Sequence, residues 1–385
     1  MRASRPAPRR RRWFRMSDAL KRLAGILDKL GEFGASDFHL TANRGAFFVK
    51  DKQTRPMPNL PTDCGDMLAA IINECVPGGP GVLDERGQAG ASFDEGGAYR
   101  GRIAIRQEHG GLSSTIRIIG RDIPTPDDLG LPQSVVGLIG RPSGLALYVG
   151  QTGSGKSTTI AAQVNLVNQT QSTGIYTLES PIEYVYPAGK SLVVQREVGV
   201  HVNSFAEGVE DAKRSHPRII VVGEILNAAT ARAALLAAAS GHLVVSTMHA
   251  GTAAEAVDSF VSMFTPEEQG LIRTQLAQSL LGIVAQKLLP KQGGGMALAQ
   301  EIAFNTPAMA ELLRGGGADR SASTKYIQQL LLGTGTADGM VAMEESLARL
   351  VKEGAITLQT AQNNARDQQA FTDKLQQVGV RRPAA

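Results

Sequence analysis

One short segment has the composition of a loop that binds phosphate groups. Its residues are Gly150, Gln151, Thr152, Gly153, Ser154, Gly155, Lys156 and Ser157. Glycines let successive backbone N–H groups converge on phosphate oxygens, the lysine reaches the β- and γ-phosphates, and the hydroxyl after it binds magnesium. An apolar run, Leu145 to Val149, precedes the segment and a helical pattern follows it, which is the strand–loop–helix context that the motif requires. Together with the next residue, Thr158, the segment predicts a site for ATP and Mg²⁺.

Two polar residues follow apolar runs that are typical of buried parallel strands. Glu224 comes just after Ile219 to Val222, and His249 lies just beyond Leu243 to Ser246. Ligands of open parallel sheets bind at the carboxyl ends of the strands. We therefore expect Glu224 to be the general base that acts on water, and His249 to donate to a γ-phosphate oxygen and so report whether that phosphate is present.

A second acidic pair follows another apolar run. Glu179 comes directly after Ile175 to Leu178, and Glu183 lies four residues further on. We expect both carboxylates at the same edge of the sheet as catalytic residues, with Glu179 also a ligand for Mg²⁺ beside Ser157. The competing interpretation is that these glutamates are solvated loop residues.

The pattern of apolar residues predicts an α/β chain with five segments. We expect a basic disordered arm at 1–16, a small α+β domain at 17–120, a proline-rich linker at 121–142, a doubly wound P-loop domain at 143–304 and a helical region at 305–385.

Individual elements follow from the same pattern. In the first half we predict an amphipathic helix capped by Ser17, strands at Ala35–Leu40 and Ala46–Val49, a helix around Asp66–Cys75 and a hairpin over Tyr99–Ile119. In the second half the apolar runs named above are the predicted parallel strands. Their predicted helices are Ser157–Val167, Ala228–Ser240 and Ala253–Phe264.

Composition limits the classes of function. The chain has 385 residues and a net charge of +4, but seven arginines lie in residues 1–15, which leaves 33 basic against 36 acidic residues in the remainder. A mildly acidic body without a basic and aromatic stripe argues against stable nucleic-acid binding. No apolar run approaches the roughly 18 residues of a spanning helix, and Trp13-Phe14 lead into polar residues rather than a signal sequence. With only two cysteines, Cys64 and Cys75, we expect a cytoplasmic protein.

The motifs together resemble those of the secretion ATPases of the type II secretion and type IV pilus superfamily, in particular their pilus-retraction (twitching motility, PilT-like) branch. Thr177 to Tyr184 is similar to the Asp box of that family, Ile219 to Glu224 to its Walker B region, and Gly241 to His249 to its His box. Gln195 to Val198 and Ala35 to Leu40 also resemble family segments.

This resemblance implies a PAS-like amino-terminal domain, a RecA-like P-loop domain and a homo-hexameric ring. ATP would lie between subunits, with Arg100, Arg102 and Arg117 reaching its phosphates from a neighbour. Such a ring would hydrolyse ATP to retract a pilus. It would work at the inner face of the cytoplasmic membrane, on an inner-membrane pilus or secretion platform protein, and would meet the membrane only through partners.

Several departures from the family pattern keep other functions open. Ser180 and Asn227 stand where the family usually has acids, and Gly110 where an arginine is common. The alternatives are an ATPase of a conjugative-transfer or effector-secretion system, a catalytically weak ring subunit that modulates a paralogue, and a DNA-translocating motor. A pilus-extension or secretion-assembly ATPase would carry a tetracysteine zinc motif, which two cysteines cannot form.

Overall fold

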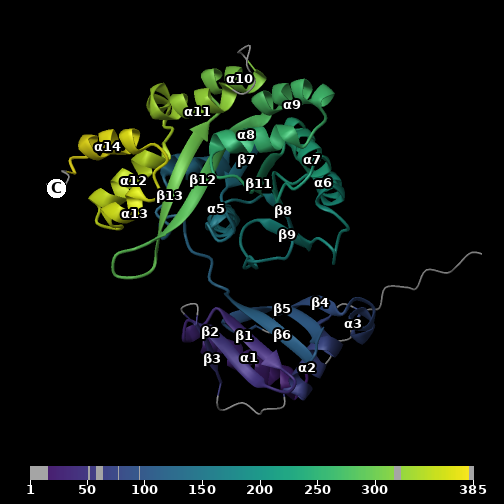
Figure 1. The fold of residues 1–385 in the computed structure, drawn as a ribbon. Coiled ribbons are helices and arrows are strands. Elements are labelled where there is room, and N and C mark those ends of the chain that lie inside the picture. Colours follow the sequence, from purple (N-terminus) through teal and green to yellow (C-terminus); the bar gives the residue numbers. More distant parts are fainter. Residues whose placement is uncertain are drawn as a thin grey trace, which may run out of the picture. The chain divides into compact units, whose positions relative to one another are not determined.

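The computed structural model forms two units, Met1–Asp122 and Ile123–Ala385, which are drawn together in Figure 1 and are considered one at a time. The described residues are 16–50, 53–57, 64–76, 78–94, 96–315 and 322–380. The arginine-rich arm predicted at 1–16 therefore lies outside the described residues, apart from Met16.

The first unit is an antiparallel sheet with helices. The strand order is β3-β2-β1-β6-β5-β4, and every neighbouring pair is antiparallel. Its strands are β1 (Asp37–Thr41), β2 (Gly45–Lys50), β3 (Gln53–Pro56), β4 (Gln88–Phe93), β5 (Tyr99–Glu108) and β6 (Gly111–Gly120). Its helices are α1 (Asp18–Glu32), α2 (Gly65–Ala70), a π-helical turn (Ile71–Cys75) and α3 (Pro80–Arg86).

Helix α1 begins as its sequence predicts. The Ser17 hydroxyl accepts a hydrogen bond from the N–H of Leu20, and apolar residues three or four apart form one buried face. That face packs into a core that includes Leu20, Leu23, Leu27, Leu30, Phe38, Ile103 and Ile116. The predicted hairpin is confirmed as β5 and β6, and the helix predicted around Asp66 divides into α2 and the π-helical turn.

The second unit is built on a mostly parallel sheet. The strand order is β13-β12-β7-β11-β10-β8-β9, and β13 alone runs antiparallel to its neighbour. The strands are β7 (Gly144–Val149), β8 (Gly174–Glu179), β9 (Leu192–Glu197), β10 (Ile219–Val222), β11 (Leu243–Met248), β12 (Leu280–Pro290) and β13 (Met296–Phe304). The four apolar runs predicted as parallel strands are β7, β8, β10 and β11.

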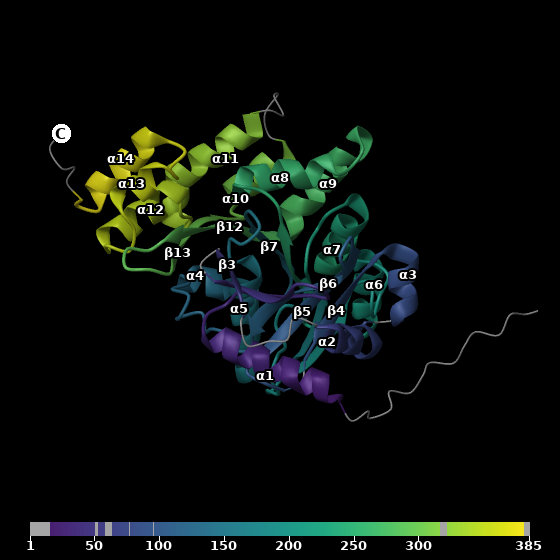
Figure 2. The same ribbon diagram turned by 60° about the horizontal axis from the view of Figure 1, so that its bottom comes forward.

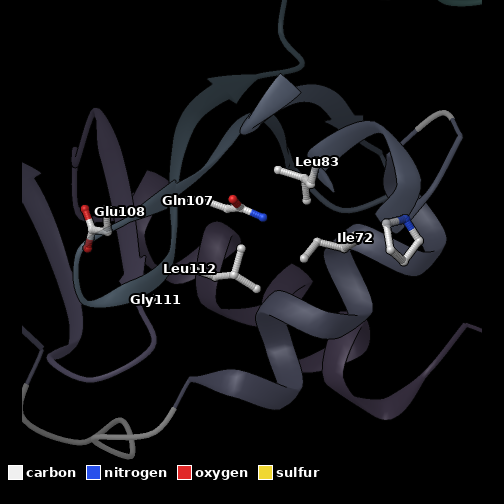
Figure 3. A pocket seen from close by; sticks show the side chains of 7 residues that line it. Ile72, Leu83, Gln107, Glu108, Gly111 and Leu112 are labelled. Carbon is white, nitrogen blue, oxygen red and sulfur yellow. The ribbon is translucent and has the colours of Figure 1, made fainter. Parts of the chain in front are cut away.

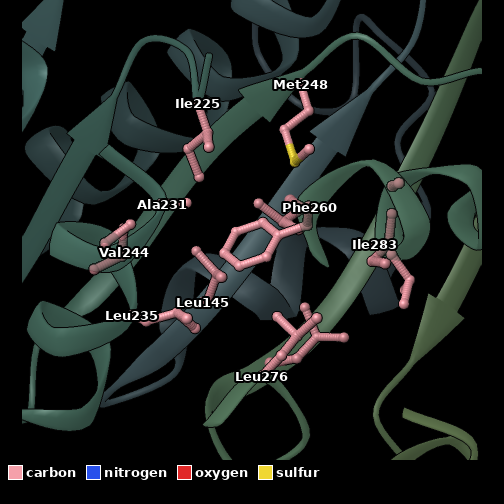
Figure 4. Packing of buried hydrophobic residues seen from close by; sticks show 14 of the residues in the cluster. Leu145, Ile225, Ala231, Leu235, Val244, Met248, Phe260, Leu276 and Ile283 are labelled. Atoms are coloured by element: carbon pink, nitrogen blue, oxygen red, sulfur yellow. The ribbon is translucent and has the colours of Figure 1, made fainter. Parts of the chain in front are cut away.

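Helices cover both faces of this sheet. They are α4 (Gln133–Val136), α5 (Lys156–Thr170), α6 (Phe205–Arg214), α7 (Ala228–Ala239), α8 (Ala253–Ser262) and α9 (Pro266–Ser279). Alternate residues of β7 face opposite sides. Ala146 and Tyr148 lie in the core beneath α4 and α5, whereas Leu145 packs with Phe260 and Leu276 of α8 and α9 (Figure 4). Burial on both faces explains the near-continuous apolar strands.

The chain then becomes helical, as predicted beyond residue 305. The remaining helices are α10 (Pro307–Arg314), α11 (Ala322–Leu332), α12 (Met343–Lys352), α13 (Leu358–Gln362) and α14 (Gln368–Gln377). Figures 1 and 2 show α12, α13 and α14 gathered beside β12 and β13. Their small core includes Leu289 and Ala299 of the sheet and Met343, Leu347 and Phe371 of the helices. Within the described ranges, no helix is long and apolar enough to cross a membrane.

Candidate functional site

The glycine-rich segment forms the turn between β7 and α5. Gly150 has a φ of 150° and Gly155, which precedes α5, has a φ of 89°. A Cβ on Gly150 would lie 2.5 Å from the Ser154 hydroxyl oxygen and 2.6 Å from the carbonyl oxygen of Gln286. Only glycine fits there, because a side chain would collide with the backbone of β12.

Lys156 is the first residue of α5 and is folded over the loop. Its ammonium group donates to the carbonyl oxygens of Gly150 (2.8 Å) and Gln151 (3.0 Å). Burial lowers the pKa of Lys156, and the carboxylates of Glu224 and Glu183 act in the opposite direction. The two glutamates thus favour the charged form of the lysine, against the effect of burial.

The loop has the properties of a phosphate cradle. The buried hydroxyl oxygen of Ser154 has no hydrogen-bond partner among the described residues, and a buried polar group without a partner is costly. Ser157, in the first turn of α5, is exposed, at the helix end where anions are favoured. The donor set present thus fits a nucleotide phosphate.

Glu179 ends β8 and is held by three donors. The Thr177 hydroxyl donates to Oε1 at 2.7 Å, the Gln195 side-chain amide donates to the same oxygen at 3.1 Å, and the N–H of Glu183 donates to Oε2 at 3.2 Å. Burial raises the pKa of Glu179, although these donors oppose the change. The carboxylate therefore fixes the start of the loop that leads to Glu183.

Two residues to which the sequence assigns no separate role complete this loop. The Gln195 amide also donates to the carbonyl oxygen of Tyr184 at 2.8 Å, and the Tyr184 hydroxyl lies 3.0 Å from the Thr158 hydroxyl. Thr158, predicted to bind nucleotide, thus connects α5 to the acidic loop. The role of Gln195 follows from the pairing of β8 with β9, which the sequence does not reveal.

Glu224 and His249 lie side by side. Nε2 of His249 is 2.7 Å from Oε1 of Glu224, with side-chain exposures of 52% and 26%, although their approach does not have the angle of a hydrogen bond. Hydrogen bonds connect the end of β11 to the loop that follows β10. The Thr247 hydroxyl donates to the carbonyl oxygen of Gly223 at 2.7 Å. The N–H of Ile225 donates to the carbonyl oxygen of Thr247 in return.

The structure thus brings the P-loop lysine, three glutamates and one histidine to the carboxyl edge of one sheet. The predicted arginines belong to the other unit, where Arg100 and Arg102 lie on β5 and Arg117 on β6. Arg102 and Arg117 are directly opposite each other, and Arg117 pairs with Asp37 at 3.3 Å. Their predicted approach to phosphates from a neighbouring subunit stays a prediction.

In the part of the chain that the structure describes, acidic and histidine side chains do not form a ready metal site. Among the described residues, no group of three or more His, Cys, Asp or Glu side chains could hold a metal ion. Magnesium at nucleotide sites usually takes one or two protein ligands, and phosphates and water supply the rest. The exposed Ser157 hydroxyl suits that mode of binding.

A pocket in the first unit contains none of the predicted site residues. It has a volume of about 370 Å³, and Ile72, Leu83 and Leu112 point into it (Figure 3). Its complete lining is Ile72, Pro80, Leu83, Gln107, Glu108, Gly111 and Leu112. A mostly apolar lining with a single carboxylate offers no phosphate-binding chemistry.

A glycine-rich turn from a parallel strand into a helix, with acids at the carboxyl ends of two other strands of the same sheet, defines the class of P-loop nucleotide-binding α/β proteins. The chain belongs to the family described as Type II/IV secretion system protein, whose pattern matches residues 131–382.

Two bacterial proteins are similar to most of the chain. The "Type IV pilus retractation ATPase PilT" of Pseudomonas aeruginosa is 35% identical over 338 residues, which cover 88% of this chain and 96% of that protein. A "Twitching motility protein" of Neisseria gonorrhoeae is 33% identical over 312 residues, 80% of each chain. The crystal structure of "the Pilus Retraction Motor PilT and Bound ADP" matches with a TM-score of 0.82 and 35% identity, covering 91% of this chain and 99% of that one.

Proposed function

We propose that this chain is a motor ATPase that couples ATP hydrolysis to type IV pilus retraction and so to twitching motility. The observation that carries the proposal is the group at the P-loop edge of the sheet. Glu224 lies 2.7 Å from His249, and its carboxylate raises the pKa of Lys156. The likeness to a pilus-retraction ATPase over most of the chain supports the choice of motor.

In this proposal each residue of the group has a separate role. Residues 150–158 bind ATP, and Lys156 compensates the charge of its β- and γ-phosphates. Glu224 accepts a proton from the attacking water, and His249 donates to the γ-phosphate. Ser157 would hold Mg²⁺, which would supply neutralisation of the phosphate charge. Glu179 is held by three donors in the acidic loop. That it also binds Mg²⁺ stays a prediction, as does the catalytic role of Glu183.

The same proposal includes an assembled ring. The first unit would be a PAS-like domain and the second a RecA-like domain, in a homo-hexamer whose neighbours supply Arg100, Arg102 and Arg117. A cation delivered across a subunit boundary would couple hydrolysis to movement of the subunits. The ring would act on a pilus platform protein at the inner face of the cytoplasmic membrane.

Replacement of the P-loop lysine tests the central claim. Lys156→Ala should abolish ATP binding and phosphate release, because it removes the cation that lies over the loop. Lys291→Ala, which removes an exposed lysine after β12, is the matched control and should leave both unchanged. Light scattering of the wild-type protein with nucleotide should give the mass of a hexamer. Full ATPase activity in Lys156→Ala would refute the function.

A further inference from the structure

A charged cluster holds the segment that follows His249. Arg366 occupies the turn between α13 and α14, and its guanidinium donates to the carbonyl oxygen of Gly251. Gly251 is two residues after His249. The guanidinium also donates to Oε2 of Glu301 on β13 at 3.4 Å. One side chain from the C-terminal region thus contacts the segment beyond the candidate histidine.

Glu301 holds the same segment from a second direction. Its Oε1 accepts a hydrogen bond at 2.7 Å from the N–H of Ala253, the first residue of α8. The side chain is 7% exposed. Burial raises the pKa of Glu301, while the Ala253 N–H and Arg366 both favour the charged form. Arg366 and Glu301 therefore fix the backbone on both sides of Thr252.

The turn that carries Arg366 also reaches the strand beside the P-loop. The Lys287 ammonium donates to the carbonyl oxygen of Asn364 at 3.4 Å. Gln286, its neighbour on β12, donates to the Thr159 hydroxyl at 2.9 Å. The backbone N–H of Arg366 is itself held, since it donates to Oε1 of Glu344 on α12 at 3.1 Å.

We propose that Arg366 is a positioning residue through which helices α12–α14 control the placement of the loop that carries His249. The proposal rests on the proposed function and adds a means of regulation to the same site. A displacement of the C-terminal helices moves the guanidinium, which withdraws a charge-assisted hydrogen bond from Gly251 and leaves the buried Glu301 without its cation. His249 then loses its fixed position beside Glu224.

The first test separates turnover from binding. Arg366→Gln should lower kcat about 10- to 100-fold, the cost of a small misplacement near reacting groups. Nucleotide affinity should stay unchanged, because Arg366 does not contact the P-loop. Lys374→Gln is the matched control, since Lys374 belongs to α14 and pairs with Glu345 at 3.1 Å without contacting the His249 loop. It should leave kcat unchanged. An equal fall in kcat for both variants would overturn the proposal.

The second test does not depend on hydrolysis. Amide hydrogen exchange in residues 249–253 should be faster in Arg366→Gln than in the wild type or Lys374→Gln, since the loop has lost an anchor. If Arg366→Gln does not fold, Arg366→Lys keeps the charge near Glu301 but lacks the planar fork that serves two acceptors, and it should show the same change. Unaltered exchange in a folded Arg366 variant would refute the positioning role even if the wild type were no ATPase. Failure of the wild type to hydrolyse ATP would refute the proposed function alone.

Discussion

The ends of β8 and β10 carry similar carboxylates in different surroundings. Glu179, at the end of β8, accepts hydrogen bonds from Thr177, Gln195 and the backbone of Glu183. Oε1 of Glu224, beyond β10, has no hydrogen-bond donor among the described residues. Lys156 and His249 are ionisable neighbours of Glu224.

This difference separates two uses of a carboxylate at one sheet edge. A carboxylate whose oxygens are occupied by donors organises the backbone around it, and it must give up a bond before it can accept a proton or a metal ion. A carboxylate with an oxygen that no donor occupies can accept a proton without first losing a hydrogen bond. We therefore propose Glu224 as the base and assign Glu179 mainly to the architecture of the acidic loop.

The largest effect is expected when Glu224 loses its basicity, and this change tests directly whether Glu224 rather than Glu179 is the base. Glu224→Gln should retain ATP binding while turnover falls by roughly 10² to 10⁴, the usual contribution of a positioned general base. Phosphate release under single-turnover conditions measures it. The comparison would be reversed if Glu224→Gln kept its turnover while Glu179→Gln lost it.

A smaller effect is expected at the neighbour of Glu224. His249→Asn should lower turnover by about 10², comparable to the loss of one donor to a developing charge. Binding of ADP, which has no γ-phosphate, should be unaffected. Titration of the variant with ADP and with a non-hydrolysable ATP analogue measures this. Equal weakening for both nucleotides would show that His249 does not respond to the γ-phosphate.

The smallest effect concerns Glu179 and is one of stability. Because burial raises its pKa above the ordinary 4.5, the folded protein holds this proton more tightly than the unfolded chain does. Wild-type stability therefore falls as the pH rises from about 4.5 through the raised pKa. Glu179→Gln removes this dependence, so the free energy of unfolding of the variant relative to the wild type should increase across that pH range by about 1.4 kcal/mol per pH unit at most. Urea denaturation measures both free energies of unfolding. If they changed with pH in the same way in the variant and the wild type, the raised pKa of Glu179 would be contradicted.

The sequence predicts those elements that show a motif, an apolar run or a helix cap within a few neighbouring residues. The P-loop, strands β7, β8, β10 and β11, and the capped helix α1 are all visible in the sequence. In strand β4, Ala89, Ala91 and Phe93 alternate with exposed residues and pack on the core, but side chains as small as alanine give an apolar signal too weak to predict a strand. Strands β9, β12 and β13 are also absent from the predicted elements, although β9 pairs with β8 and β13 with β12, the strands that precede them in the chain.

The site divides in the same way. Lys156, Glu224, Glu179 and His249 follow strands that can be predicted, so their convergence at one edge follows from parallel topology. Arg366 cannot be placed from the sequence, since its partner Gly251 lies 115 positions away and no periodic pattern links the two.

The contacts of Lys156 bear on the selectivity of the loop. Its ammonium group already donates to two backbone carbonyl oxygens, at 2.8 and 3.0 Å, so an incoming ligand competes with the protein for the same protons. Neutral acceptors offer little more than the carbonyls do, whereas an ionised oxygen adds the attraction of opposite charges to the hydrogen bond. The loop therefore favours a strongly anionic ligand over a neutral one. The heat of binding measures the difference between the hydrogen bonds of Lys156 to the ligand and those to the two carbonyl oxygens that the ligand displaces.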